Sequence, residues 1–106
     1  MAPIIWTGKA LSDLDALILY ISKDSHHYAK IFIRRIFEIA ENLKDFPQSG
    51  RVVPEFGDSF IREILYKDYR IIYHLKETGE SVHILTITHG AMSMIHLDGI
   101  EGESFP

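Results

Sequence analysis

The hydrophobic and polar positions alternate most densely between residues 62 and 90, where runs of Ile, Leu, Val, Tyr and Thr are interrupted at only two places. The first interruption is Lys67-Asp68, and the second is residues 77–80. Runs of β-branched and aromatic residues that are bounded by short polar stretches are typical of strands joined by turns. The pattern therefore predicts a three-stranded meander, around which the rest of the chain is expected to be arranged.

The turn lengths determine which residues of the meander face one another. A two-residue first turn leaves Glu63 diagonal to Arg70, and a four-residue second loop places His74 opposite His83. This register also divides the side chains between two faces of the sheet. One face is expected to carry Arg70, Ile72, His74, His83 and Leu85, and the other face Tyr69, Ile71, Tyr73, Leu75, Val82 and Ile84.

Helical periodicity dominates the first half of the chain. A short apolar run at residues 4–6 predicts a first strand, and Thr7 and Ser25 are each placed to cap a helix that follows. The apolar positions of the two helices are Leu11, Leu14, Leu17, Ile18 and Ile21, then Ala29, Phe32, Ile36, Ile39, Ala40 and Leu43. Because the connection between them is short, we expect an antiparallel helical hairpin.

The remaining segments have weaker patterns. Phe46-Pro47 is expected to end the second helix, since a residue before proline is pushed out of the helical conformation. Residues 51–55 include a proline, which predicts an edge strand or a strap across the sheet. Residues 91–97 are apolar enough for a final short strand or a docking segment, whereas residues 98–106 are expected to be an acidic, frayed tail. We therefore interpret residues 1–97 as a single domain.

Composition and charge limit the cellular compartments and the classes of partner that are expected for this protein. The 106 residues include no cysteine and carry a formal net charge of −4. The lack of cysteine excludes a disulfide framework and a thiol nucleophile, and it fits a reducing compartment. Because the sequence shows neither a signal-peptide pattern nor an apolar run of membrane-spanning length, we expect a cytoplasmic protein without a membrane partner. The acidic balance argues against a protein that grips long stretches of nucleic acid.

Metal, nucleotide and serine-nucleophile chemistry find little support in the sequence. There are six histidines, but His26 and His27 are adjacent and point apart on a helix, and only His74 and His83 are expected to converge. The chain contains no G-x-S-x-G motif and no glycine-rich loop that would cradle a phosphate. We therefore expect neither a metal nor a cofactor.

A group of arginine, tyrosine and histidine residues carries the remaining candidate chemistry. The group consists of Arg51, Arg62, Tyr69, Arg70, Tyr73 and His89. Guanidinium groups suit a phosphodiester oxyanion and a histidine can transfer a proton, so such a group is able to cleave RNA through its own 2′-hydroxyl without metal. The alternative is structural: Arg62 and Arg70 pair with nearby carboxylates such as Glu63 and Glu55, and the tyrosines are half-buried sheet residues.

An ordered set of short motifs resembles the RelE/ParE superfamily of bacterial type II toxins. The N-terminal half contributes Trp6, Asp13-Leu14, Tyr20-Ile21, Leu43–Arg51 and Val53-Pro54-Glu55. The C-terminal half contributes Arg62-Glu63-Ile64, Tyr69–Tyr73 and Ile87–Gly90. The resemblance extends over residues 4–90 and is stronger to the ParE-like plasmid-stabilisation branch than to RelE proper.

The resemblance implies an α+β fold in which an N-terminal strand and a helical hairpin pack on a mostly antiparallel twisted sheet. It also implies an antitoxin partner whose extended segment lies along the toxin. The assembly that it implies is either a homodimer or a toxin-antitoxin hetero-oligomer. ParE-like members bind and inhibit DNA gyrase and so inhibit growth, whereas RelE-like members cut messenger RNA on the ribosome.

The two branches imply different roles for the candidate residues. A gyrase inhibitor is not an enzyme. A RelE-like endoribonuclease would use Arg62 and Arg70 on the phosphate, with His89 or Tyr73 for proton transfer. The residues expected to contact the target protein or the phosphate are Arg51 and Tyr69.

Two departures from the superfamily pattern argue against the ribonuclease. Members commonly carry an arginine shortly after the His-Gly pair, whereas this chain has Ala91-Met92-Ser93-Met94 there and no basic residue after Lys76. The acidic charge is also unlike that of toxins that dock beside ribosomal RNA. The first departure raises a third possibility, a weakly toxic or inactive member that mainly binds its antitoxin.

Overall fold

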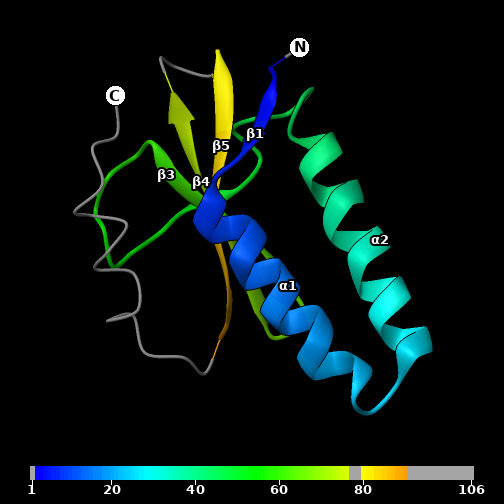
Figure 1. The fold of residues 1–106 in the computed structure, drawn as a ribbon. Helices are drawn as coiled ribbons and strands as arrows, with labels where there is room; N and C mark the ends of the chain where they lie inside the picture. The colour runs from blue at the N-terminus through cyan, green and yellow to red at the C-terminus, as the bar shows by residue number, and fades with distance from the viewer. Residues whose placement is uncertain (1, 77–79, 91–106) are drawn as a thin grey trace.

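The computed structural model describes residues 2–76 and 80–90 and has an α+β fold. In chain order its elements are β1 (Ile4–Trp6), α1 (Gly8–Ser22), α2 (His26–Asn42), β2 (Arg51–Val52), β3 (Ile61–Tyr66), β4 (Tyr69–Lys76) and β5 (Ser81–His89). The strands form one sheet in the order β1-β5-β4-β3-β2, in which β1 is parallel to β5 and the other pairs are antiparallel. Both helices lie on the same side of the sheet (Figure 1). The predicted meander is therefore confirmed as β3, β4 and β5.

Each helix begins at the predicted capping residue. The Thr7 hydroxyl accepts a hydrogen bond from the Ala10 amide at 3.2 Å, and the Ser25 hydroxyl accepts one from the Tyr28 amide at 3.0 Å. Both bonds satisfy a backbone donor that the first helical turn leaves unpaired. Leu11, which the periodicity placed on the apolar side of α1, is 49% exposed, and Ala10 occupies the core position instead.

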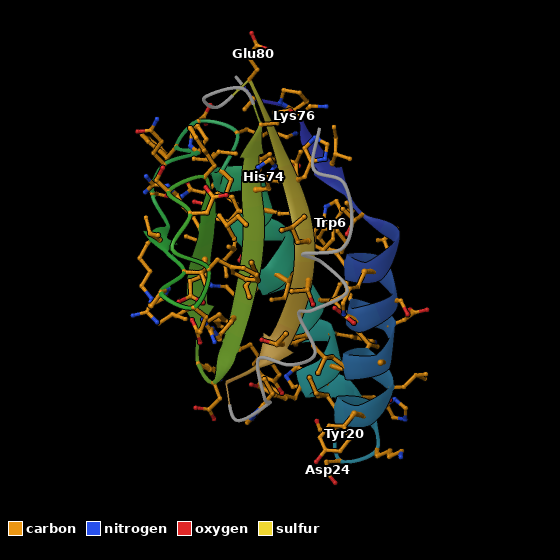
Figure 2. The ribbon with its side chains drawn as sticks, turned by 90° about the vertical axis from the view of Figure 1, so that its left-hand side faces the viewer. Trp6, Tyr20, Asp24, His74, Lys76 and Glu80 are labelled. Atoms are coloured by element: carbon orange, nitrogen blue, oxygen red, sulfur yellow. The ribbon has the colours of Figure 1, made fainter. Side chains whose placement is uncertain are left out.

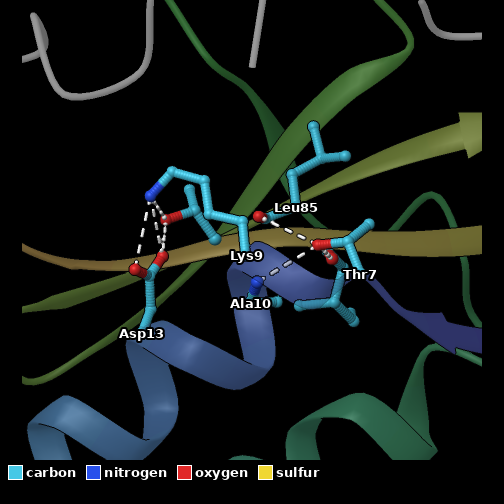
Figure 3. Close-up of polar contacts among 7 residues, drawn as sticks. Thr7, Lys9, Ala10, Asp13 and Leu85 are labelled. Atoms are coloured by element: carbon cyan, nitrogen blue, oxygen red, sulfur yellow. Dashed lines mark hydrogen bonds and ion pairs between the residues drawn. The ribbon is translucent and has the colours of Figure 1, made fainter. Parts of the chain in front are cut away.

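The start of α1 is bound to β5 by side chains (Figure 3). The Thr7 hydroxyl donates to the carbonyl oxygen of Ile84 at 2.7 Å, while the buried Thr86 hydroxyl is hydrogen-bonded to the Asp13 carboxylate. Lys9 pairs with the same carboxylate at 3.1 Å. The contacts of Thr7 with Ile84 and of Asp13 with Thr86 connect residues that are more than 70 positions apart, so α1 and β5 depend on one another for their placement.

The sheet carries a core cluster on each of its faces. The larger cluster lies between the helices and the sheet and includes the predicted stripe residues Ala29, Phe32, Ile36 and Leu43 together with Ile71, Tyr73, Val82, Ile84 and Ile87. The smaller cluster on the other face consists of Val53, Ile61, Ile72 and Leu85, with Phe56 packed against it. Val53 is fully buried next to the edge strand β2, so the predicted strap closes this second cluster.

The predicted register is confirmed, with one irregularity that the sequence did not indicate. His74 lies opposite His83 in the pairing of β4 with β5. Tyr73 pairs with Ile84 but Ile72 pairs with Thr86, so Leu85 has no partner in β4. An extra residue of this kind is a β-bulge, which turns the local backbone groups. The bulge carbonyls of Ile84 and Leu85 are the two that accept from Thr7.

Several sequence predictions concern segments outside the described residues. These include the apolar segment 91–97, the tail 98–106 and therefore the domain boundary at residue 97. Within residues 2–76 and 80–90, neither helix combines the length and the apolar character that a membrane crossing requires.

The His74–His83 pair predicts a pH dependence of stability. Burial lowers the pKa of both imidazoles, and Lys76 lowers both further, while Asp58 opposes the shift at His74. The unfolded histidines therefore bind protons at a higher pH than the folded ones. Consequently the free energy of unfolding is expected to fall as the pH is lowered below about 6.5, where the unfolded histidines titrate.

Chemical denaturation at several pH values measures this effect. The double variant His74→Gln/His83→Gln is expected to lose less stability than the parent between about pH 7.5 and 5.5. The matched control, His26→Gln/His27→Gln, removes two exposed histidines and is expected to retain the parent's pH dependence. Equal slopes for the parent and the His74/His83 variant would contradict the assignment.

Candidate functional site

An open cleft of about 670 Å³ lies where the β3–β4 turn, the end of β5 and the strap after β2 meet. Four of the six candidate residues, Arg51, Tyr69, Arg70 and His89, line this cleft. They come from β2, β4 and β5, so only the folded sheet brings them together. The lining also includes Glu55, Leu65, Lys67, Asp68 and Gly90.

A buried carboxylate organises the arginines of the cleft. Glu63 is only 1% exposed, and its two oxygens accept hydrogen bonds from the Nε atoms of Arg51 and Arg70, both at 2.6 Å. Arg70 also forms a two-point contact with Glu55, in which both N···O distances are 3.0 Å. A carboxylate out of contact with water needs such partners, because an unpaired buried charge is strongly destabilising. The structural alternative, in which arginines pair with nearby carboxylates, is therefore confirmed for Arg70, whereas Arg62 donates to backbone carbonyl oxygens instead.

This network leaves the cleft electrically balanced. The hydrogen bonds to Glu55 and then to Glu63 keep the pKa of Arg70 above its usual value, and the Arg70 guanidinium lowers the pKa of Glu55. Around the cleft, the cationic side chains are Arg51, Lys67 and Arg70, and the carboxylates are Glu55, Glu63 and Asp68. Arg70 is 12% exposed at its side chain, whereas Arg51 is 59% exposed and so presents the more accessible guanidinium.

Tyr69 and His89 form an aromatic pair where β4 begins and β5 ends. The two residues are register partners in β4 and β5, and their rings meet edge to face at a centroid distance of 5.3 Å. The centroid of the Phe32 ring of α2 lies 4.9 Å from that of Tyr69, and burial raises the pKa of the Tyr69 phenol. The Gly90 amide donates to the Asp68 carbonyl oxygen, which joins the end of β5 to the β3–β4 turn.

Arg62 and Tyr73, the other two candidates, do not line the cleft. Arg62 donates to the backbone carbonyl oxygens of Gly50 at 3.0 Å and Ser59 at 3.1 Å. Tyr73 is fully buried; its hydroxyl donates to the Pro47 carbonyl oxygen at 2.8 Å and accepts from the Gly50 amide at 2.9 Å. Both side chains hold the loop between α2 and β2, and the sequence spacing alone did not reveal these partners.

Six residues of the cleft lining, among them Lys67 and Glu55, lie outside the candidate group. The sequence pattern indicates Lys67 only as a turn residue and Glu55 only as an ion-pair partner. Their proximity to Arg70 in the cleft depends on the hairpin turn and on the strap after β2, neither of which has a residue-type signature for a site. Within residues 2–76 and 80–90, no three metal-ligating side chains converge.

Comparison with known proteins gives consistent matches. The family model described as the ParE toxin of the type II toxin-antitoxin system parDE matches residues 4–94. Toxin RelE2 of Caulobacter vibrioides is 32% identical over 91 residues, which cover 86% of this chain and 98% of the relative. A chain in a solved structure, the chromosomal ParDE TA system from P. aeruginosa, has a TM-score of 0.67 at 24% identity and covers 84% of this chain and 96% of its own length. This structural likeness supports the fold.

The burial of Tyr73 leads to a prediction that distinguishes a structural role of its hydroxyl from a role in the function. Tyr73→Phe removes the hydroxyl that satisfies the buried Gly50 amide, so the free energy of unfolding is expected to fall by about 1 to 3 kcal/mol. Denaturant titration measures this loss. The activity per folded molecule is expected to stay at the parent level. A stable variant with lost activity would instead place Tyr73 in the functional chemistry.

Proposed function

The chain belongs to the ParE toxin family of type II toxin-antitoxin systems, and we propose that it inhibits DNA gyrase by binding it when no antitoxin is bound. An antitoxin is the partner expected of a toxin in such a module. In this proposal the protein acts in the cytoplasm and is not an enzyme. The cleft that contains Arg51, Tyr69, Arg70 and His89 is its contact region for the target.

The observation that carries this proposal is the occupation of Arg70 by two carboxylates. Cleavage of RNA requires donors that are free to stabilise the charge developing on the phosphate. Here Glu63 and Glu55 hold Arg70, and its pairing would have to break before a phosphate could bind. A protein target makes no such demand, because a charge-balanced cleft with aromatic residues suits a protein interface.

A RelE-like endoribonuclease is the alternative, and one feature of the cleft favours it. Arg51, whose side chain is 59% exposed, lines the same cleft as His89, so a guanidinium that suits a phosphate and an imidazole that can transfer a proton lie on one surface. Arg62 and Tyr73, the other residues that this mechanism would use, face the loop at residues 47–50. The further alternative, a weakly toxic member that mainly binds its antitoxin, follows from the missing basic residue after His89-Gly90.

Two assays on the purified chain discriminate between these functions. We expect the chain to inhibit the supercoiling activity of purified gyrase and to leave messenger RNA intact in a translation reaction analysed by primer extension. Addition of the antitoxin, identified as the product of the neighbouring small open reading frame, is expected to restore supercoiling. Codon-spaced cleavage with normal supercoiling would instead support the endoribonuclease, and inactivity in both assays would support the weakly toxic member.

The assignment of the cleft is tested by substitution of Arg70 and His89. His89→Ala and Arg70→Ala are each expected to weaken gyrase inhibition by about tenfold or more, because residues at the centre of an interface carry most of its binding energy. Arg70→Lys provides a second variant that preserves the charge beside Glu63 if the alanine variant is unstable. Growth arrest on induction is expected to weaken in parallel.

The control for these variants is Lys44→Ala, which removes a basic residue that pairs with Glu41 near the end of α2, away from the cleft. It is expected to inhibit gyrase as strongly as the parent. If the His89 and Arg70 variants fold, as judged by thermal melting, and also match the parent in both assays, the cleft is not the contact region.

A further inference from the structure

Four of the five tyrosines gather at one end of the molecule. Tyr66 and Tyr69 flank the β3–β4 turn, Tyr28 lies in the first turn of α2, and Tyr20 lies near the end of α1. Tyr20 and Tyr28 are both close enough to raise the pKa of Tyr69 electrostatically, after the larger effect of burial. Figure 2 shows Tyr20 at the end of the molecule opposite Lys76 and Glu80.

Lys67 is the centre of this end of the molecule. Its ammonium lies 4.9 Å from the ring centroid of Tyr28 and 5.8 Å from that of Tyr66, and the Arg35 guanidinium lies 6.0 Å from the Tyr66 centroid. Cations placed over aromatic faces in this way are attracted by the ring quadrupole. We call the set Tyr20, Tyr28, Arg35, Tyr66 and Lys67 the tyrosine tip.

The backbone of Lys67 adopts a conformation that its side chain does not favour. Its φ angle is +53°, and it is the one described residue other than glycine with a positive φ. Glycine is the residue that adopts this region without steric cost, and it is the usual choice where a two-residue turn needs a positive φ. Strained non-glycine residues cluster at functional positions, so the positive φ of Lys67 indicates that the tyrosine tip is a candidate binding surface.

The five residues of the tip include two cations, Lys67 and Arg35, and no carboxylate. Two carboxylates lie at the same end of the molecule: Asp68 follows Lys67 in the turn, and Asp24 is beside Tyr20 (Figure 2). Arg35 also approaches Glu38 at 3.4 Å, at an exposed position where such a pair is weak. Lys67 and Arg35 are the cations that the tip presents in a chain whose formal net charge is −4.

The tip also exposes apolar area and continues into the cleft. Leu19 and Tyr20 at the end of α1 are both 67% exposed. Lys67 belongs both to the tip and to the lining of the cleft, which also includes Tyr69, two positions further along the chain. Exposed aromatic and apolar side chains combined with arginine and lysine resemble the centre of a protein interface more than an ordinary solvated surface.

We propose that the tyrosine tip is a docking surface for an acidic segment of the protein that this toxin inhibits. The inference rests on the proposed function, in which that target is a protein. Carboxylates of the segment would pair with Lys67 and Arg35 on the outer side of the tyrosine rings, and its apolar residues would cover Leu19 and Tyr20. Such a complementary charge pattern accelerates association and selects the partner.

The arrangement of the rings favours a protein segment over a single-stranded nucleic acid. Proteins that bind single strands stack the bases on free aromatic faces. In the tip, Lys67 lies over the faces of Tyr28 and Tyr66, and Arg35 lies over Tyr66 as well. The cations are thus presented to an anion while the ring faces are engaged with them.

The test uses two substitutions of Lys67 and one matched control. Lys67→Glu reverses the charge, and Lys67→Gly removes the side chain while allowing the positive φ, so the glycine variant is expected to melt no earlier than the parent. Lys76→Glu makes the same charge reversal at the opposite end of β4 (Figure 2). The measurements are the affinity for purified gyrase, the inhibition of supercoiling and the affinity for the antitoxin.

The expected result is a loss of gyrase affinity of about tenfold for Lys67→Gly and more for Lys67→Glu, with parent-like affinity for Lys76→Glu. Antitoxin affinity is expected to change much less. If the parent inhibits gyrase and both Lys67 variants do so equally well, the inference is overturned while the proposed function stands.

Other outcomes would assign the tip to a different partner and also overturn the inference. A loss of antitoxin affinity with unchanged gyrase affinity would make the tip an antitoxin contact. Reduced binding of a labelled single-stranded DNA oligonucleotide, again with unchanged gyrase affinity, would make it a nucleic acid contact. If the parent chain neither binds nor inhibits gyrase, the proposed function is wrong, and the inference that rests on it is overturned as well.

Discussion

Glu63 places a carboxylate within the sheet, where almost no water reaches it, and the face of the sheet away from the helices is arranged around its two oxygens. Taking such a charge out of water costs several kcal/mol unless partners compensate it. Arg51 reaches it from the edge strand β2, and Arg70 reaches it from β4 on the other side. Arg70 in turn binds Glu55, so the strap after β2 is fixed by the same charge. The cleft is a product of this chain of ion pairs.

On the helix side of the sheet the packing of apolar side chains takes the place of ion pairs, and this part of the fold was easier to predict. The stripe from Ala29 to Leu43 and the caps Thr7 and Ser25 are local signals, because spacing along the chain alone determines which side of a helix is apolar and where it begins. The register that places His74 opposite His83 was equally accessible, since the two turn lengths determine it. Exposed Leu11 shows the limit of periodicity at a helix end.

The candidate site was only partly accessible from the sequence. Residue type selected Arg51, Tyr69, Arg70 and His89, and the pairing of β2, β3, β4 and β5 in one sheet brings these four to the same cleft. It did not reveal that Tyr73 turns its hydroxyl to the loop at Pro47 and Gly50. A tyrosine in a strand has the same local pattern whether its hydroxyl lies in a cleft or bonds to a loop 23 or more residues away. The bulge at Leu85 also lacks a local signal, since it serves the bonds from Thr7.

The parallel pairing of β1 with β5 has a consequence for how the chain acquires its structure during synthesis. Ile4 pairs with Val82, so the first strand leaves the ribosome 78 residues before its partner. At typical bacterial elongation rates this interval is roughly 4 to 16 seconds. During that time the helical hairpin can form from local contacts, but the sheet that covers its apolar side does not yet exist. A chain of this topology thus has no assembled cleft until the His89 end of β5 has been made, which provides an interval in which a partner or a chaperone can meet the chain before its cleft forms.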